Sequence, residues 1–458
     1  MKVIICGAGQ VGFHLARYLS AENNDITVVD QSPELIGKIN DQLDVQAFVG
    51  HAAHPHTLER AGAEDADMLI AVTFTDEVNM TACQVAHSLF NVPTKIARIR
   101  QQNYLDPLWG NLFSKDNLPI DVIISPEIEV ARAINRRLHV PGAFDMIPMA
   151  DDRVRVIGVR CTEDTPIINT PLRQLTSLFP DLSIRVIGIR RDAKMIIPTS
   201  NDQMFAGDEV YFVTETTHLS RAMSAFGHEE KETRRIVIIG GGNIGTYLAK
   251  ELEEANDGYS ARIIEYSPER AREVAEILPT TSVIRGDALD SEILEEANIS
   301  RAEAVVAVTD QDETNILSSL LAKRHGVERA ITLVNKANYN QLINNLGIDV
   351  VVSPREITAS TILQHVRRGR IRAVHSLRDA EAEVIEAEAL ATSQLVGKAI
   401  RDAKIPKGVV VGAIVRGEEI IIPRAGTIIE ENDIIILCAS SEVVRKVEKL
   451  FAVRLEYF

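Results

Sequence analysis

The chain alternates short runs of β-branched apolar residues with longer segments of helical periodicity. The first such runs cover Lys2–Cys6, Ile26–Val29, Met68–Val72 and Lys95–Ile99. Continuous apolar strands that alternate with helices are typical of parallel sheets covered on both faces. We therefore predict an α/β domain at residues 1–125, and the same pattern predicts a second one at residues 232–352.

A different pattern follows each predicted α/β domain. Short extended runs, separated by Pro, Gly, Asn and Asp, cover residues 185–189, 195–197, 209–213, 409–415, 420–422 and 434–437. They predict small, strand-rich α+β domains at residues 143–228 and 371–455, with crossover helix linkers at 126–142 and 353–370. The polar stretch that opens at Gly227 has no apolar side chain to bury, so it marks the boundary between the halves.

The two halves repeat each other in their landmark residues. Gly7–Gly12 recurs as Gly240–Gly245, an offset of 233 residues, and Asp30–Glu34 recurs as Glu265–Glu269, an offset of 235. The strand-rich segments also repeat, with an offset of 225 residues. The domain order is therefore A-B-A-B, where A has the parallel-sheet pattern and B the strand-rich pattern.

Composition limits the classes of function. The length of 458 residues and the 45% hydrophobic content predict several cores. A formal net charge of -16 argues against non-specific binding to nucleic acid or anionic lipid, since both need a basic surface.

No apolar run approaches the ~18–20 residues of a membrane-spanning helix, and the first strand is too short for a secretory signal. The four cysteines are too scattered to predict a disulfide framework or a zinc site. We expect a cytoplasmic chain that begins at Met1.

A glycine-rich motif follows the first strand of each half and predicts a nucleotide site. A residue without a side chain permits the sharp strand-to-helix turn at Gly7, lets the backbone approach a pyrophosphate at Gly9, and allows close helix packing at Gly12. Free N–H groups at the start of the next helix point at the phosphates, so binding needs no basic side chain. The motif residues are Gly7, Ala8, Gly9, Gln10, Val11 and Gly12, and then Gly240, Gly241, Gly242, Asn243, Ile244 and Gly245. We predict two Rossmann-like domains that bind a nucleotide; the alternative is a Rossmann scaffold that no longer binds one.

A carboxylate ends the second strand of each half. Asp30 lies about 20 residues after the motif, where an acidic side chain accepts hydrogen bonds from the hydroxyls of an adenosine ribose. It should also repel a 2′-phosphate. Glu265 occupies the same place in the second half, with a longer reach. We therefore expect NAD(H), ATP or ADP to bind in preference to NADP(H).

Positive charge distinguishes the two predicted sites. Arg98 and Arg100 fall opposite Leu333 and Asn335 in the second half, so only the first site has arginines for phosphates unless Lys336 substitutes. A charged polyphosphate fits the first site better. The alternative is that these arginines form surface salt bridges.

Three histidines follow the third strand of the first half, at His51, His54 and His56. Neither a paired cysteine nor a carboxylate cluster accompanies them, so we interpret them as a loop and helix start and predict no metal site. His51 aligns with Asp287 and is expected near the ligand.

Acidic and basic residues near predicted helix starts have simpler interpretations than catalysis. Two acidic pairs precede helical stretches, where carboxylates cap free N–H groups and complement the helix dipole: Asp76 with Glu77, and Asp312 with Glu313. Arginines follow the start of each linker, at Arg132, Arg136 and Arg137 and at Arg367, Arg368 and Arg370. They either meet acidic partners in an assembly or form a solvated helix face.

The tandem arrangement resembles a known family. Two Rossmann units, each followed by a small strand-rich unit, are similar to the domains that regulate potassium conductance (RCK or KTN domains), in the order found in regulatory proteins of Trk-type potassium uptake. The resemblance covers essentially the whole chain. It includes Ser125–Glu127 and Ser353–Glu356, which resemble the start of the crossover helix that leaves each Rossmann unit.

The resemblance implies a regulatory subunit, and no enzymatic activity. It implies a peripheral protein on the inner face of the cell membrane that self-associates into a ring, expected to be a homotetramer, and gates an integral membrane potassium transporter of the Trk type. Nucleotide binding to one ring conformation would shift its population. The family pattern places the ligand on the first glycine motif and on Asp30, Thr73, Phe74 and Arg98. Thr309 corresponds to Thr73 in the second half, and at His51 the family more usually has an acidic residue.

Two other classes of function compete with this interpretation. An NAD-dependent oxidoreductase of unknown substrate needs a substrate domain with an acid or base, and the small units lack a convincing His or Lys constellation. An NAD-responsive transcription regulator needs a helix-turn-helix or a basic stripe, and neither is evident, so we expect no nucleic-acid partner.

Overall fold

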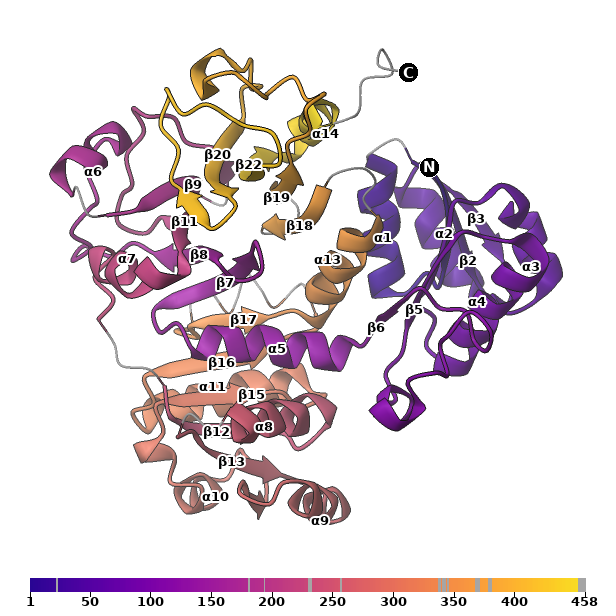
Figure 1. The fold of residues 1–458 in the computed structure, drawn as a ribbon. Helices are drawn as coiled ribbons and strands as arrows, with labels where there is room; N and C mark the ends of the chain where they lie inside the picture. The colour runs from indigo at the N-terminus through magenta and orange to yellow at the C-terminus, as the bar shows by residue number, and fades with distance from the viewer. Residues whose placement is uncertain are drawn as a thin grey trace. The chain divides into compact units, whose positions relative to one another are not determined.

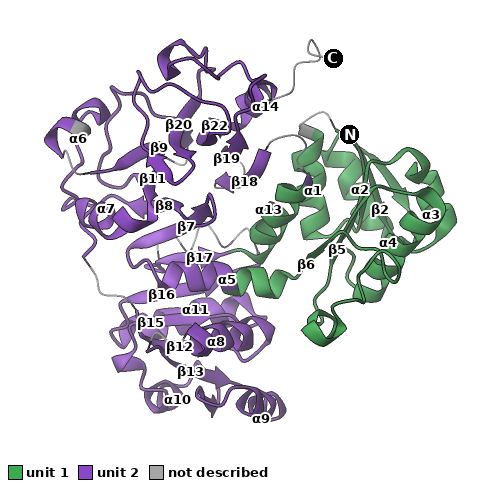
Figure 2. Ribbon diagram, in the orientation of Figure 1, with its two compact units in different colours: residues 1–131, 353–365 green, residues 132–352, 366–458 purple. Residues whose placement is uncertain are grey.

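The computed structural model describes two compact units of the chain (Figure 2). Unit 1 comprises residues 1–131 and 353–365, and unit 2 comprises residues 132–352 and 366–458. The description omits residues 22–23, 180–181, 193, 230–232, 256–257, 337–338, 340–342, 344–345, 367–370, 378–380 and 452–458. The predicted domain limits at 232, 370 and 455 therefore lie outside the described residues, as do Arg367, Arg368 and Arg370.

A six-stranded parallel sheet forms the core of unit 1, with strand order β3-β2-β1-β4-β5-β6 (Figure 1). Its strands are β1 (Lys2–Cys6), β2 (Asp25–Asp30), β3 (Gln46–Val49), β4 (Met68–Ala71), β5 (Thr94–Arg98) and β6 (Val122–Ile124). Its helices are α1 (Gln10–Ala21), α2 (Pro33–Gln42), α3 (Pro55–Arg60), α4 (Asp76–Phe90), the start of α5 (Pro126–Leu138), and α13 (Pro354–Val366). The strand order reverses between β1 and β4, and a crevice for ligands forms at such a point, outside the carboxyl ends of the strands.

Unit 2 contains a second sheet of the same topology, with strand order β14-β13-β12-β15-β16-β17. Its strands are β12 (Arg235–Ile239), β13 (Ser260–Glu265), β14 (Ser282–Arg285), β15 (Ala304–Ala307), β16 (Arg329–Leu333) and β17 (Val350–Val352). Its helices are α8 (Asn243–Ala255), α9 (Pro268–Ile277), α10 (Ser291–Glu296) and α11 (Asp312–Arg324). The prediction of two Rossmann-like sheets is confirmed.

The repeat extends to the helix starts. Ser32 Oγ accepts the backbone N–H of Leu35 at 3.3 Å, and Ser267 Oγ accepts that of Arg270 at 3.2 Å. A proline follows each of these serines, at the position where its fixed φ suits a helix and its missing N–H costs nothing. The Ser-Pro pairs seen in the sequence therefore start α2 and α9.

Two five-stranded antiparallel sheets make up the rest of unit 2, with orders β10-β9-β11-β8-β7 and β18-β19-β22-β20-β21. The first has β7 (Ala143–Met149), β8 (Val154–Arg160), β9 (Ile184–Arg191), β10 (Lys194–Ile196) and β11 (Glu209–Glu215), with α6 (Leu172–Leu178) and α7 (Leu219–Ala225). The second has β18 (Ile371–Leu377), β19 (Ala382–Glu388), β20 (Val409–Arg416), β21 (Glu419–Ile421) and β22 (Ile434–Ser440), with α14 (Val444–Phe451). The last three strands of each sheet along the chain match the predicted extended runs, whereas the first two were not predicted.

The two antiparallel sheets share one hydrophobic core. Val156 and Val213 of the first sheet pack in the same buried cluster as Val384 and Ile436 of the second. A methyl group added at Gly412 would lie 2.6 Å from a methyl carbon of Val213, so the sheets meet closely there. The predicted small domains therefore bury apolar faces against each other.

A buried aspartate fixes the same turn in both small sheets. Asp208, which is 2% exposed, accepts from Arg191 Nε at 2.8 Å and from Nη2 at 2.7 Å. Asp433, which is 1% exposed, accepts from Arg416 Nε at 2.8 Å and from Nη2 at 2.9 Å. Each carboxylate also accepts the backbone N–H three residues earlier, at 2.8 and 2.7 Å. Fork-shaped pairing of this kind is strong and directional, so it explains why Asp208 and Asp433 occupy the same position in the two strand-rich segments, 225 residues apart.

Each repeat contributes a helix that packs against the other repeat. In unit 2, the later part of α5 contacts α8: Asn135 Nδ2 donates to Glu251 Oε2 at 3.2 Å, and Arg132 Nε lies 3.6 Å from Glu251 Oε1. In unit 1, Arg355 at the start of α13 donates to Gln10 at the start of α1, with 3.3 Å from Nη1 to Oε1. The linkers at Ser125 and Ser353 therefore do lead into crossover helices.

The arginines of α5 find partners in the same chain. Arg132 faces Glu251, and Arg137 forms an ion pair with Asp145, 2.5 Å from Nη2 to Oδ1. The expectation of a solvated helix face is therefore wrong for Arg137, which is 13% exposed, whereas Arg132 stays 49% exposed beside its partner. The reason is that the crossover places them against α8 and β7.

Two further features concern the cysteines and the composition of the helices. All four cysteines are buried and free, and burial raises the pKa of the Cys6 and Cys161 thiols to about 12. Within the described ranges, the longest apolar helices fall short of what a bilayer crossing requires.

Candidate functional site

The first glycine loop has the backbone that the motif predicts. Gly7 has a φ of +114°, and a side chain there would meet the carbonyl oxygen of Val72 at 2.8 Å. A methyl group at Gly12 would lie 1.8 Å from the carbonyl oxygen of Gly7, whereas one at Gly9 would meet nothing within 4 Å. Gly7 and Gly12 are therefore required by the fold, and Gly9 faces open space at the start of α1.

The second loop repeats this geometry. Gly240 has a φ of +105°, and a methyl group at Gly245 would lie 2.0 Å from the carbonyl oxygen of Gly240. Gly242 faces open space like Gly9, while Gly241 packs near Glu265. The remaining motif residues, Asn243 and Ile244 here and Val11 in the first half, lie in the first turns of α8 and α1.

Both strand-end carboxylates are tied to their glycine loops. Asp30 accepts the N–H of Ala8 at 2.7 Å and that of Ser32 at 2.8 Å, with one carboxylate oxygen for each. Glu265 makes the same pair of contacts, with the N–H of Gly241 at 2.7 Å and of Ser267 at 2.8 Å. Each oxygen keeps a further lone pair, so each carboxylate can also accept from a ligand hydroxyl.

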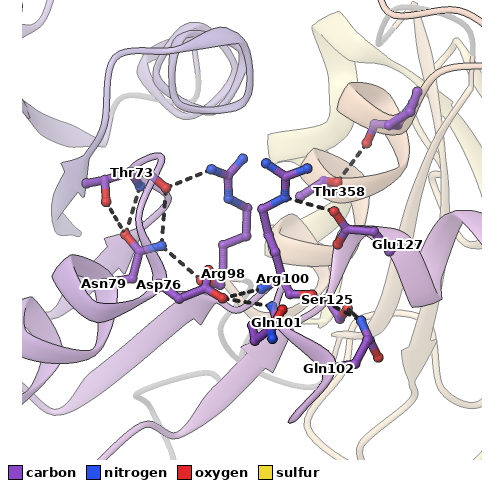
Figure 3. Close-up of polar contacts among 11 residues, drawn as sticks. Thr73, Asp76, Asn79, Arg98, Arg100, Gln101, Gln102, Ser125, Glu127 and Thr358 are labelled. Carbon is purple, nitrogen blue, oxygen red and sulfur yellow. Dashed lines mark hydrogen bonds and ion pairs between the residues drawn. The ribbon is translucent and has the colours of Figure 1, made fainter. Parts of the chain in front are cut away.

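A buried asparagine braces the loops that follow β4 and β5 (Figure 3). Asn79 is fully buried, and its Oδ1 accepts the N–H and the hydroxyl of Thr73 at 2.8 and 2.7 Å. Its Nδ2 donates to the carbonyl of Arg98 at 2.9 Å. Asn315 makes the corresponding contacts to Thr309 and to Leu333 in the second half. This role was not predicted, although the repetition of the two asparagines after a Val-Thr pair is visible in the sequence.

Arg98 and Arg100 extend side by side from the end of β5 (Figure 3). Arg98 Nη2 donates to the carbonyl of Thr73 at 2.7 Å, and its Nε is buried without a hydrogen-bond partner among the described residues. Arg100 Nε donates to Glu127 Oε1 at 2.8 Å. Burial lowers the pKa of Arg98, and the like charge of Arg100 lowers that pKa further. An anion placed against these guanidinium groups would relieve their repulsion.

The acidic residues at the start of α4 and α11 organise the neighbouring loop. Asp76 Oδ2 accepts the N–H groups of Arg100 and Gln101 at 2.9 and 2.8 Å. Asp312 accepts those of Asn335 and Lys336, at 2.9 and 2.8 Å. The expected capping of their own helices is therefore wrong for these two residues, because each carboxylate turns toward the loop after the next strand.

The second site has different cations. Lys336 Nζ donates to Glu313 Oε1 at 2.8 Å, and this hydrogen bond lowers the pKa of Glu313 to about 2. Arg270 instead reaches the glycine loop, where its Nε donates to the carbonyl of Gly241 at 2.8 Å. Arg270 was not predicted as a site residue, because it corresponds to Leu35 in the first half.

The outer edges of the two sites also differ. Phe74 is 85% exposed beside the first site. His51 Nδ1 accepts the N–H of Ala53 at 3.3 Å, and its ring stacks on that of His54. In the second half, Asp287 lines a surface depression with Tyr266, Pro268, Arg285 and Gly286.

The comparisons with known proteins agree with this architecture. Residues 3–126 and 236–354 match the TrkA-N domain, and residues 156–227 and 384–452 match the TrkA-C domain. The Trk system potassium uptake protein TrkA of Azorhizobium caulinodans is 51% identical over 458 residues, which cover 100% of both chains. The chain belongs to the TrkA family. The TrkA proteins of Vibrio alginolyticus and Halomonas elongata are 44% and 42% identical, covering 98% and 100% of this chain and the same shares of their own.

Solved structures share the fold of this TrkA family member. The GsuK RCK domain covers 99% of this chain and 95% of its own, with a TM-score of 0.60 and 19% identity. The GsuK channel bound to NAD covers 99% of this chain and 79% of its own, with a TM-score of 0.59 and 19% identity. The resemblance to RCK domains predicted from the sequence is therefore confirmed.

Proposed function

We propose that this chain is a nucleotide-binding regulatory subunit of a Trk potassium uptake system, with no catalytic role of its own. Its curated relatives are named as Trk system potassium uptake proteins. One of its structural neighbours is a channel bound to NAD. We assign NAD(H), ATP or ADP to the first site in preference to NADP(H).

The single observation that carries the proposal is the positive charge that gathers beside the first glycine loop. Gly9 leaves open space at the N-terminus of α1, where N–H groups attract phosphate. Arg98 and Arg100 add two guanidinium groups, of which one has a buried Nε without a partner among the described residues. Glu127 neutralises one of these charges, so a phosphate group would neutralise the other.

The remaining predicted residues are assigned by their positions. Asp30 would accept from the ribose hydroxyls, Thr73 would present the loop after β4, and Phe74 and His51 would flank the ligand. In the second half, Glu265 and Thr309 take the corresponding roles, and Asp287 and Arg270 give that site a different chemistry. We expect weaker selection for charged polyphosphates there, because the arginines of the first site are replaced by Leu333 and Asn335.

The partner would be an integral membrane potassium transporter, with this chain on the inner face of the membrane as a homotetrameric ring. A nucleotide can change the transporter only by as much as its affinity differs between two conformations of the ring. The fold provides a route for such a difference, since each nucleotide-binding repeat contributes a helix that packs on the other.

Titration calorimetry tests the binding part of the proposal. NADH, NAD, ATP, ADP and NADPH would be titrated into the full chain and into Asp30→Ala. We expect NADPH to bind most weakly, and Asp30→Ala to weaken the other ligands on the order of tenfold or more, because it removes a charged acceptor. Asp25→Ala is the matched control, since Asp25 lies exposed at the opposite end of the same strand. Absence of binding by the unmodified chain would refute the proposal.

Potassium transport tests the regulatory part. Rubidium uptake would be measured in vesicles that hold the cognate transporter, with and without the chain and the nucleotide. We expect uptake to change when the nucleotide is added, and to change less with Asp30→Ala. The same preparations would be assayed for oxidation of NADH with small carbonyl compounds. Turnover without any effect on transport would favour the oxidoreductase alternative.

A further inference from the structure

Arg355 links the second repeat to the first glycine loop. It lies in the first turn of α13, which follows the second parallel sheet in the sequence but belongs to unit 1. Its Nη1 donates to Oε1 of Gln10 at 3.3 Å, and Gln10 is the first residue of α1. Figure 2 shows α13 and α1 in the same unit. A cation from one repeat therefore lies at the phosphate end of the other repeat's nucleotide loop.

The side chain of Arg355 is only partly neutralised where it lies. Its exposed fraction is 18%, and its Nε is buried without a hydrogen-bond partner among the described residues. Its Nη2 lies 3.6 Å from Oε1 of Glu356. A contact of that length is too long for a hydrogen bond. The guanidinium group therefore has donors left over for an anion.

Comparison of the repeats explains why this position carries an arginine. Its counterpart in the first half is Glu127, which pairs with Arg100. In the second half the position of Arg100 is taken by Asn335, which needs no acidic partner. The charge has thus been reversed at the start of α13, while the equivalent position of α5 keeps its carboxylate. A solely structural role at the helix start gives no reason for this reversal.

We propose that Arg355 binds the phosphate groups of the nucleotide in the first site. In the ligand-free chain, Gln10 holds the guanidinium near the loop, and a bound pyrophosphate replaces that amide as the acceptor. The second repeat then contacts the ligand of the first, and α13 senses occupancy. This inference rests on the proposed function, since it requires a nucleotide at the first glycine loop.

Calorimetry on the full chain separates Arg355 from the rest of the site. All variants would carry Gly242→Val, which fills the open space of the second loop and restricts binding to the first. ADP, NADH and adenosine are the probes. We expect Arg355→Gln to weaken ADP and NADH on the order of tenfold, because a charged hydrogen bond is lost, and to leave adenosine unchanged. Arg355→Lys should recover part of the loss.

The matched control is Arg17→Gln. Arg17 lies on the same helix as Gln10, about 10 Å along the axis at 1.5 Å per residue. Arg17→Gln therefore removes one positive charge, as Arg355→Gln does, but leaves the contact with Gln10 intact. We expect less than a threefold change in ADP affinity.

Unchanged ADP affinity in Arg355→Gln would overturn the inference, and so would equal losses for adenosine and ADP, which would indicate that Arg355 only docks α13. If the chain with Arg355 intact bound none of the probes, the proposed function itself would fail.

Discussion

The asparagine brace of the first site offers a test in which the chain supplies its own control. Asn79→Leu keeps the branching and the number of heavy atoms of the side chain, but the N–H of Thr73 and the carbonyl of Arg98 lose their side-chain partners. An unsatisfied buried group costs about 1–3 kcal/mol. The two groups together should therefore cost about 3 kcal/mol. Because each 1.4 kcal/mol is about tenfold, the opening equilibrium of these loops should rise on the order of 100-fold.

Hydrogen exchange measured by mass spectrometry resolves this effect by segment. In Asn79→Leu we expect faster exchange in peptides that cover residues 72–79 and 98–101, with no change around residues 308–315. Asn315→Leu should give the reverse pattern, because its contacts repeat those of Asn79. The nucleotide affinity of the first site should fall only in Asn79→Leu. If exchange in the affected loop changed less than threefold, the brace would not hold the site, and the reasoning would be wrong.

Three further predictions use other parts of the structure. Gly12→Ala should unfold the first glycine loop, because its methyl group would lie 1.8 Å from a carbonyl oxygen. Gly9→Ala should keep the melting temperature of the chain and lose nucleotide affinity. Equal melting temperatures for the two variants would contradict this prediction. Asp208→Asn and Asp433→Asn should each destabilise unit 2 by about 1–3 kcal/mol, since each weakens charged hydrogen bonds between a buried carboxylate and a partly exposed arginine, and denaturation in urea would measure the loss. Burial raises the pKa of Glu386 in the folded chain. The free energy of unfolding should therefore fall as the pH rises from about 4.3, the pKa of the unfolded side chain, to the raised pKa of the folded one. Glu386→Gln should remove this part of the pH dependence. Melting temperatures measured from pH 4 upward would refute the prediction if they fell with pH as steeply in the variant as in the unmodified chain.

Local patterns made part of this structure predictable. The glycine motifs, Asp30 and Glu265 are spaced along the sequence as the Rossmann turn requires, so the sheets and both loops follow from the chain itself. Strand β8, Val-Arg-Val-Ile-Gly-Val-Arg, was just as accessible through its β-branched residues, and was overlooked.

Other features depend on contacts between distant residues. Asp76 turns to a loop 24 residues away, and Arg355 reaches Gln10 across 345 residues. No periodicity or spacing encodes such pairings. The first depends on how the loop after β5 folds back on α4, and the second on a helix that crosses between the repeats. A helix that crosses between the repeats also brings Arg132 to Glu251, which lies 119 residues further along the chain.

The exchanged helices also have an evolutionary consequence. If the ancestor was a single repeat that formed a dimer, every substitution in it appeared twice, and a charge reversal at the start of the crossover helix would have altered both sites together. Fusion into one chain removed that restriction. Glu127 could keep its pair while Arg355 took the opposite charge, and one gene could specialise its two halves. Separating them again as independent proteins should therefore not restore two equivalent subunits.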